Sequence, residues 1–560
     1  MSQTYVTFRR FVSVLGSFAL SALVVAAVPA SQASAQTTIT GTVYAPNGTD
    51  PLPNILVYVA STPLQPFQNG PGTSCANQNA VVSGNPIAEA VTDYKGEFTI
   101  TSTALTALGT TSVNVVVQAG KWRQQYPNTP ITGGAANGPL TLSMPSTQGT
   151  LSDLPRIAVV TGSVDGVECV LHTMGIADSE FTDFNGSGHI NLFPGTGGAG
   201  AKASAASSVN ETNLMLDAPT INSYDMVMFG CQGTAVDSTI TNNAIGRQNL
   251  VAYANAGGRV FATHFEYSWL NKTDTFASVA NWTGGPNYTN TIDLANANAT
   301  IDTSYPDGLI LANWLYYTMK ASPTLGQIPL ITTRQDQTGV VPPTRSWATL
   351  NVSGNPVMQF TFDTPLGQAT TPIVLVTFTN TNTNNSTTFP NAFVTGDVGD
   401  KITANIGDQI NSGATQPGLT ITFQPPPQTT ITNLAPTNAG SGWSCNTATL
   451  TCVETASILG GASDPITVTV DIPSNALPLG DAEFTAIISG GGISGSSQCG
   501  RVLYNEYHVE NVSSAGGRVF PAECPSGAPD AQEKFLEYSL YNLSNFIAPV
   551  TADTIDIQAP

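Results

Sequence analysis

The sequence Tyr-Asp-Met-Val-Met-Phe-Gly-Cys-Gln-Gly at residues 224–233 decides the fold of this chain, together with Arg-Val-Phe-Ala-Thr-His-Phe-Glu at 259–266. Each stretch contains a short apolar run that ends in a polar or glycine-rich turn, and a helical segment separates the two. This arrangement predicts a βαβ unit with parallel strands. Ligands bind beyond the carboxyl ends of such strands. Cys231 and His264 therefore occupy positions where chemistry is expected.

Further segments of the same kind extend this unit into a flavodoxin-like α/β domain. Arg156–Gly162 has the composition of a buried strand, and apolar residues at helical spacing follow within Asp165–Met174. Much later, Cys499–His508 is typical of a strand that ends in a histidine, and Ala528–Phe546 is predicted to be an amphipathic helix. Because such a helix needs a sheet to cover, we assign residues 155–367 and 497–548 to one α/β domain.

Two β-rich segments accompany this domain. Residues 37–150 alternate apolar and polar side chains between frequent turn residues, which predicts a small β-sandwich. The same alternation returns after about Gln359, with loop signals such as Pro425-Pro-Pro. We therefore predict a second, immunoglobulin-like β-sandwich at 368–496, inserted into the α/β domain. The expected fold class is multidomain, β plus α/β.

The first 35 residues match the plan of a secretory signal peptide. Arg9 and Arg10 precede an apolar run from about Phe11 to Val28, and the small-residue site Ala-Ser-Ala at 33–35 follows. We expect cleavage directly after this site; the alternative is that the apolar run anchors the chain in a membrane. No other long apolar run occurs in the sequence, so no membrane span is expected after signal removal. The expected location is secreted or in a bacterial-type cell envelope, in the periplasm or on the outer surface.

Charge limits the classes of partner. Only 10% of the 560 residues are charged, and 37 acidic against 17 basic residues give a net charge of −20. A chain with this charge repels phosphate backbones and anionic lipid head groups. Nucleic acid is therefore not an expected partner. The abundance of Thr, Asn, Gly and Ser indicates a neutral, polar surface instead.

Seven cysteines in a chain with an export signal predict disulfide bonds and one cysteine left over. The pairs that we expect are Cys445 with Cys452, Cys499 with Cys524, and Cys169 with Cys231, which leaves Cys75 unpaired. The spacing of the first pair suits a bridge across a hairpin. The third pair is predicted because both residues would lie near the carboxyl edge of the parallel sheet, and the alternative for Cys231 is a catalytic thiol.

Both β-rich segments resemble known modules. The order Gly41-Thr-Val-Tyr, Pro51–Val59 and Thr92–Phe98 resembles the carboxypeptidase regulatory-like domain, a transthyretin-like sandwich. That resemblance implies a structural or binding accessory, and it does not imply peptidase activity. Gly442-Trp-Ser-Cys-Asn, with Leu-Thr-Cys after it and Ile466–Val470 beyond, resembles the conserved-repeat, immunoglobulin-like sandwich of bacterial surface proteins.

Trp122 is the candidate binding residue of the N-terminal segment. It lies between Lys121 and Arg123 in the stretch Val117–Arg123. Its ring could stack on a sugar or on a partner. The alternative is that it covers the core as an amphipathic residue at a strand end.

The α/β segment resembles the class I glutamine amidotransferase-like superfamily, in which a strand with a Gly-rich turn precedes a strand with the nucleophile elbow. The resemblance makes Cys231 and Gln232 part of the turn that carries backbone oxyanion contacts, and it matches His508 to a late strand-end histidine. The elbow departs from the family, because His264 replaces the cysteine of Gly-x-Cys-x-Gly and the bulky Phe265 follows it. Amidotransfer by a Cys–His pair is therefore not expected.

His264, Glu266 and His508 form the candidate catalytic and metal site. Two of the four histidines of the chain fall on predicted strand ends at one edge of one sheet. Their nitrogen and oxygen ligands suit zinc or another divalent metal, and a spare carboxylate can act as general base. The alternative is structural, with both histidines hydrogen-bonded across the sheet edge or packed beneath a loop.

The sequence favours an exported cell-envelope or surface protein that acts as a binding or scaffold protein, with carbohydrate or another envelope component as the expected ligand. The alternative is a metal-assisted hydrolase. The geometry of the site discriminates between them, since convergent side chains in a pocket favour an enzyme and a filled sheet edge favours a scaffold. The sequence contains no Walker loop, dinucleotide fingerprint, Gly-x-Ser-x-Gly elbow or His-Glu-x-x-His motif.

Overall fold

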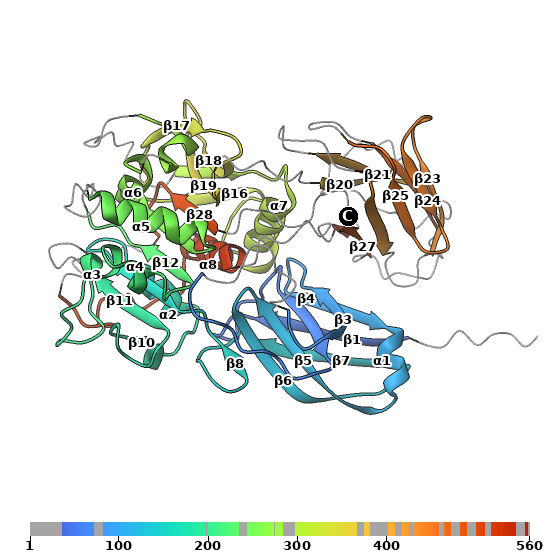
Figure 1. Ribbon diagram of the computed structural model, residues 1–560, viewed down its shortest axis with the longest axis horizontal. Coiled ribbons are helices and arrows are strands. Elements are labelled where there is room, and N and C mark those ends of the chain that lie inside the picture. The colour runs from blue at the N-terminus through green and yellow to red at the C-terminus, as the bar shows by residue number, and fades with distance from the viewer. Residues whose placement is uncertain are drawn as a thin grey trace, which may run out of the picture. The chain divides into compact units, whose positions relative to one another are not determined.

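A computed structural model describes the chain from residue 36 onward, with gaps (Figure 1). The described residues are 36–71, 82–195, 200–233, 243–273, 275–283, 297–366, 374–380, 401–408, 417–424, 430–458, 464–471, 482–489, 500–509, 517–544 and 555–557. The predicted signal peptide, Cys75 and Cys499 lie outside them. None of the described helices is long and apolar enough to cross a lipid bilayer.

The N-terminal part is built from two sheets around a shared core. β1 (Thr37–Tyr44) alternates buried and partly exposed residues along its whole length, as expected of a strand with one face on a core. β1 lies between β4 (Glu97–Ser102) and β7 (Ala136–Ser143), and α1 (Thr103–Leu108) follows β4. The other sheet has the order β3 (Pro86–Val91), β2 (Leu56–Ala60), β5 (Thr111–Ala119), β6 (Trp122–Ile131) and β8 (Ser152–Asp153).

The predicted βαβ unit is present. β12 (Met226–Phe229) and β13 (Arg259–Thr263) are parallel neighbours, and α5 (Ala244–Asn255) connects them. Every residue of β12, of β13 and of β9 (Ile157–Thr161) is buried. Such uniform burial is typical of parallel strands that are covered on both faces of the sheet.

These strands belong to a mixed sheet with the order β10-β11-β9-β12-β13-β28-β19-β18-β15-β16. Strands β10 to β28 of this order run parallel, and β19 begins an antiparallel half. The strands not yet given are β10 (Phe181–Thr182), β11 (Ile190–Pro194), β15 (Ala297–Ile301), β16 (Gln327–Leu330), β18 (Arg345–Leu350), β19 (Val357–Thr364) and β28 (Gly500–Asn505). β14 (Ala280–Trp282) and β17 (Gln337–Val340) form a separate small sheet.

β28 enters this sheet from a distant part of the sequence. It pairs with β13 on one side and with β19 on the other. The chain leaves the sheet after Thr364 and returns to it at Gly500, and the strands described between these points belong to other sheets. The pairing of Thr263 with Asn505 brings the segment that ends in His508 next to the segment of His264.

Helices surround the mixed sheet. The α-helices are α2 (Val167–Thr173), α3 (Glu211–Met215), α4 (Ala218–Ile221), α6 (Ser268–Asn271), α7 (Pro306–Asn313) and α8 (Ala531–Ser544). Short 3₁₀ helices occur at η2 (Asp178–Glu180), η4 (His264–Tyr267) and η5 (Phe276–Val279), and a π-helical turn, η6 (Trp314–Thr318), extends α7.

Helix α8 differs from the expected amphipathic helix, because all of its residues are buried. The reason is that it has the sheet on one side and the N-terminal part on another. Toward the sheet, Gln359 Nε2 donates a 3.0 Å hydrogen bond to the Ser539 hydroxyl. Toward the N-terminal part, Trp122 Nε1 donates a 3.0 Å hydrogen bond to the Ser544 hydroxyl. Lys534 on the same helix forms a buried ion pair with Asp50.

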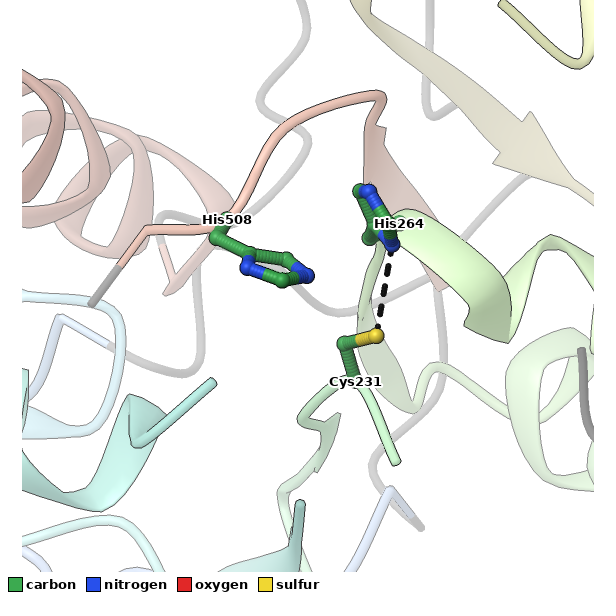
Figure 2. A group of neighbouring side chains, drawn as sticks. All are labelled: Cys231, His264 and His508. Carbon is green, nitrogen blue, oxygen red and sulfur yellow. Dashed lines mark hydrogen bonds between the residues drawn. The ribbon is translucent and has the colours of Figure 1, made fainter. Parts of the chain in front are cut away.

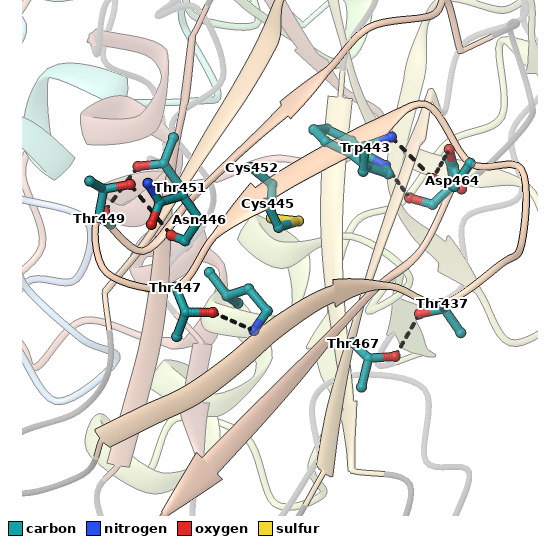
Figure 3. The surroundings of a disulfide bond; sticks show 12 residues. Thr437, Trp443, Cys445, Asn446, Thr447, Thr449, Thr451, Cys452, Asp464 and Thr467 are labelled. Atoms are coloured by element: carbon teal, nitrogen blue, oxygen red, sulfur yellow. Dashed lines mark hydrogen bonds between the residues drawn. A yellow bond between two sulfur atoms is a disulfide. The ribbon is translucent and has the colours of Figure 1, made fainter.

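The strands described between β19 and β28, together with β29 (Ile555–Ile557), form two further sheets, and one of them carries a disulfide. β24 (Trp443–Asn446) and β25 (Thr451–Glu454) are an antiparallel pair in which Cys445 faces Cys452 and bonds to it, as predicted (Figure 3). Beside this bridge, Trp443 Nε1 donates a 3.0 Å hydrogen bond to the Asp464 carbonyl. One sheet has the order β20 (Val374–Asn380), β21 (Lys401–Asp408), β26 (Ile466–Asp471), β23 (Thr430–Pro436). The other has the order β24, β25, β22 (Leu419–Gln424), β27 (Ala482–Ser489), β29.

The structure therefore confirms the predicted combination of β-sheet parts and an α/β part in one chain.

The second disulfide corrects two of the predicted cysteine pairs. Cys169 bonds to Cys524, with a Cα–Cα distance of 5.2 Å, and not to Cys231. The physical reason is the path of the chain before α8, which brings residue 524 against helix α2. Cys524 is therefore not available for the pair expected with Cys499. Cys231 is a buried free thiol.

Candidate functional site

Three side chains converge at the carboxyl ends of three neighbouring strands, β12, β13 and β28 (Figure 2). Cys231 follows β12, His264 follows β13, and His508 follows β28. Their ligand atoms all lie within 4.8 Å of one another. The Cys231 sulfur is 3.3 Å from Nδ1 of His264, and the centroids of the two imidazole rings are 4.1 Å apart. The parallel sheet thus brings together residues that are far apart in the sequence.

Burial keeps the Cys231 thiol and the His264 imidazole uncharged. Cys231 is fully buried, and His264 and His508 are 5% and 7% exposed. Burial raises the pKa of the Cys231 thiol far above its usual range, and nearby Glu266 raises it further. Burial lowers the pKa of His264 well below 6.5, with His508 and Arg334 adding to the effect. The pair is therefore a neutral thiol within hydrogen-bond distance of a neutral imidazole, and not a thiolate–imidazolium pair.

His264 has an unusual backbone conformation for a residue with a side chain. Its φ is 54°, in the left-handed region, which is costly for residues other than glycine. It marks the sharp change from strand β13 to the 3₁₀ helix η4. The hydroxyl of Tyr504 donates a 2.8 Å hydrogen bond to the His264 carbonyl and so helps to hold this turn. The chain therefore makes a sharp strand-to-helix corner at His264, which carries the imidazole.

Glu266 is not part of the converging group. In a 3₁₀ helix, successive residues are about 120° apart around the axis, so the side chains of residues 264 and 266 point in different directions. Glu266 is fully buried, and its carboxyl oxygens have no hydrogen bond within the described residues that meets normal geometry. Burial and, secondarily, nearby Glu211 raise its pKa well above 4.5. Cys231, and not Glu266, is therefore the third member of the converging group.

The other two candidate binding residues have separate surroundings. Gln232 directly follows Cys231, and its Nε2 donates a 3.0 Å hydrogen bond to the carboxylate of Glu211. Trp122 is 1% exposed and packs with its ring 5.6 Å from that of Tyr541 on α8. Its ring cannot stack on a sugar in this conformation, so the core-covering alternative is correct.

A layer of buried polar residues supports the turn at His264, and the sequence did not predict it. The Tyr504 hydroxyl also lies 3.0 Å from the Glu506 carboxylate, and the Asp336 amide donates a 3.1 Å hydrogen bond to the same carboxylate. Arg334 forms two hydrogen bonds with Asp336 and places its guanidinium 3.8 Å from the centre of the Phe265 ring. In the sequence, this layer is marked by the two charged residues of Arg-Gln-Asp at 334–336. Both of these residues are buried in the structure.

The group has the composition of a site for a soft or borderline transition metal. Thiolate and imidazole donors suit zinc and its neighbours in the first transition row, whereas magnesium and calcium require oxygen ligands. A bound cation would reverse the pKa shifts described above, since a coordinated thiol is deprotonated. Within the described residues the group supplies Cys, His and His, and three protein ligands with a fourth position left over is the pattern of catalytic zinc.

Comparisons with known proteins add little to this description. No family model and no curated protein matches the chain. Among solved structures, similarity was found to a collagen-binding domain of a Staphylococcus aureus adhesin, at 10% identity and a TM-score of 0.14 over 20% of this chain and 92% of that domain. A cytoplasmic protein of Salmonella typhimurium is 10% identical, with a TM-score of 0.22, over 37% of this chain and 82% of that chain. The N-terminal domain of PorA is 14% identical, with a TM-score of 0.11, over 23% of this chain and 94% of that domain. Values this low assign neither fold nor function.

Proposed function

We propose that this protein is an exported metal-dependent hydrolase whose metal, zinc or a similar divalent cation, is held by Cys231, His264 and His508. The observation that carries the proposal is the convergence of these three donors within 4.8 Å at the carboxyl edge of the sheet. The donors are of the kinds that zinc prefers. A metal there would act as a Lewis acid toward a carbonyl or phosphoryl oxygen.

Glu266 supplies the acid–base group of this proposal. It lies on the same 3₁₀ turn as His264, two residues further along the chain. Burial raises the pKa of its carboxyl well above 4.5, which favours the protonated form. A protonated carboxyl beside a metal site can donate a proton to a leaving group, which is the usual task of a general acid in hydrolysis.

A binding or scaffold role in the cell envelope, with a glycan as ligand, is the second candidate. The observation that favours it is the burial of all three site residues, none of which is more than 7% exposed. A filled sheet edge is what a non-catalytic α/β domain would have. Trp122 no longer supports this candidate, because its ring is inside the protein.

Metal content is the test of the proposal. The purified protein would be loaded with zinc, dialysed, and analysed for metal, beside Cys231→Ala, His264→Ala and His508→Ala. His172→Ala is the matched control, because this imidazole is 36% exposed, lies outside the converging group and forms its ion pair with the exposed Asp178. We expect about one zinc per chain in the wild type and in the control, and a large loss in the other three. A wild-type protein without zinc would refute the metal site and favour the scaffold.

Hydrolysis is tested on the zinc-loaded protein with a panel of ester, amide and phosphoester substrates. We expect turnover that is lost on chelation and in His508→Ala, and that returns when zinc is added back to the wild type. Glycan binding by the metal-free protein, without any turnover of the panel by the zinc protein, would support the second candidate instead.

A further inference from the structure

The loop between β9 and α2, residues 162–166, contacts the segments of all three proposed ligands. The Ser163 hydroxyl donates a 2.8 Å hydrogen bond to the Gln232 carbonyl, and the Val164 amide lies 3.4 Å from the Cys231 carbonyl. Gly162 packs so closely that a side-chain carbon there would lie 2.0 Å from the Cys231 carbonyl oxygen. One side of this loop therefore fixes the turn that carries Cys231.

Asp165, in the same loop, contacts the segments of both histidines. Its carboxylate accepts a 2.6 Å hydrogen bond from the hydroxyl of Thr263, the residue before His264, and the Tyr507 carbonyl is a second, longer acceptor of that hydroxyl at 3.0 Å. It also accepts the amide of Val509, the residue after His508, at 3.1 and 3.2 Å from its two oxygens. Asp165 is fully buried. A single carboxylate thus joins the two chain segments that present the imidazoles.

Sheet hydrogen bonding alone does not set the distance between the two histidines. The paired register of β13 and β28 ends at Thr263 and Asn505. Beyond this pairing, the segment after β13 turns into η4 at the left-handed His264. The segment after β28 continues through Glu506 and Tyr507 to His508. The hydrogen bonds to Asp165 lie in this region, and charge-assisted bonds in a buried setting are among the strongest that a protein forms.

We propose that Asp165 is the positioning residue of the site, which holds His264 and His508 at the separation that a shared metal requires. Asp165 lies outside the converging group itself. It acts through Thr263 and Val509, as outer partners orient ligands in other metal sites. This inference rests on the proposed function, because it assigns a purpose to the spacing of the same two histidines.

Zinc affinity of Asp165→Asn and Thr263→Val tests the inference. In Asp165→Asn the amide oxygen can still accept one hydrogen bond, but the amide NH₂ group faces a hydrogen-bond donor, either the Thr263 hydroxyl or the Val509 amide. In Thr263→Val the hydroxyl is removed at nearly constant side-chain volume. We expect each to weaken zinc binding by about 10- to 100-fold and to change the visible absorption spectrum of the cobalt-substituted protein. Thr263→Ser, which keeps the hydroxyl, should restore both properties. Asp178→Asn, at a carboxylate that is 65% exposed, is the control.

The outcomes separate a positioning role from a merely structural one. Affinities are compared among variants whose metal-free forms unfold at the same temperature as the wild type, and Thr263→Val serves if Asp165→Asn does not fold. Wild-type affinity and an unchanged cobalt spectrum in Thr263→Val would overturn the inference while leaving the metal site intact. A wild-type protein that binds no zinc or cobalt would overturn the proposed function and this inference together.

Discussion

The Cys231 sulfur forms a hydrogen bond of 3.3 Å with Nδ1 of His264, and burial keeps both groups uncharged. A metal takes the thiolate and the neutral imidazole. Above pH 7, His264 is a neutral imidazole because its pKa lies well below 6.5, so it can bind a metal through its unprotonated nitrogen without releasing a proton. The thiol still carries its proton at this pH, because its pKa is raised.

Zinc binding should therefore release about one proton per site from Cys231 at pH 8. Calorimetric titration in buffers of different ionisation enthalpy measures this number. In Cys231→Ser the release should disappear and the affinity should fall. Zinc binding to the wild type with no buffer dependence would contradict the prediction, because it would mean that the thiol is not a ligand or is already ionised.

The position of the site was predictable from the sequence, whereas its third ligand was not. His264 and His508 both end strands with buried-type sequences, and parallel strands present their carboxyl ends at one edge of a sheet. Glu266 points away from the two histidines because residues 264–267 form a 3₁₀ turn, and no pattern in the sequence predicts that turn. That Cys231 faces His264 depends on Cys169 having another partner, and this in turn depends on the long-range path of the chain.

Packing between distant segments of the chain determines the burial of Trp122 and of helix α8. Trp122 and helix α8 each have a sequence that fits a half-exposed position. In the structure the helix lies against the N-terminal part, and its residues Tyr541 and Ser544 meet the indole. Local pattern predicts which face of an element is apolar but not whether a second segment covers the other face.

Trp122→Ala should destabilise the protein strongly and leave glycan binding unaffected. Removing a buried indole lowers the free energy of unfolding by about 3–5 kcal/mol. The variant also loses the hydrogen bond from the indole to Ser544. Ser544→Ala, which removes only the acceptor, should cost about 1–3 kcal/mol. Urea denaturation measures both. Weakened glycan binding in a Trp122→Phe variant of unchanged stability would contradict the buried assignment.

The Cys169–Cys524 bridge should appear in a non-reducing peptide map and should matter more for stability than Cys445–Cys452. The two bridges join residues 355 and 7 positions apart, and in the chain-entropy view the longer loop gives roughly twice the stabilisation. We expect the double Ala variant of the first pair to unfold at lower urea than that of the second. A peptide that joins Cys169 to Cys231 would show this pairing to be wrong.

Glu168→Gln should make the protein less sensitive to high pH. Glu168 is fully buried beside the disulfide, and neither of its carboxyl oxygens has a hydrogen bond within the described residues that meets normal geometry. Burial first, then Glu523 and Asp165, raise its pKa well above 4.5.

The sign of the pH effect follows from proton binding. Above pH 4.5 the unfolded chain ionises this carboxyl, while the folded protein keeps it protonated, so the folded state binds more protons. Stability then falls by up to about 1.4 kcal/mol per pH unit until the raised pKa is reached. Gln cannot ionise, so the difference between the urea midpoints at pH 5 and pH 8 should shrink in Glu168→Gln. It should not shrink in Glu89→Gln, where the carboxyl is exposed. An equal change in both variants would mean that Glu168 ionises in the folded protein.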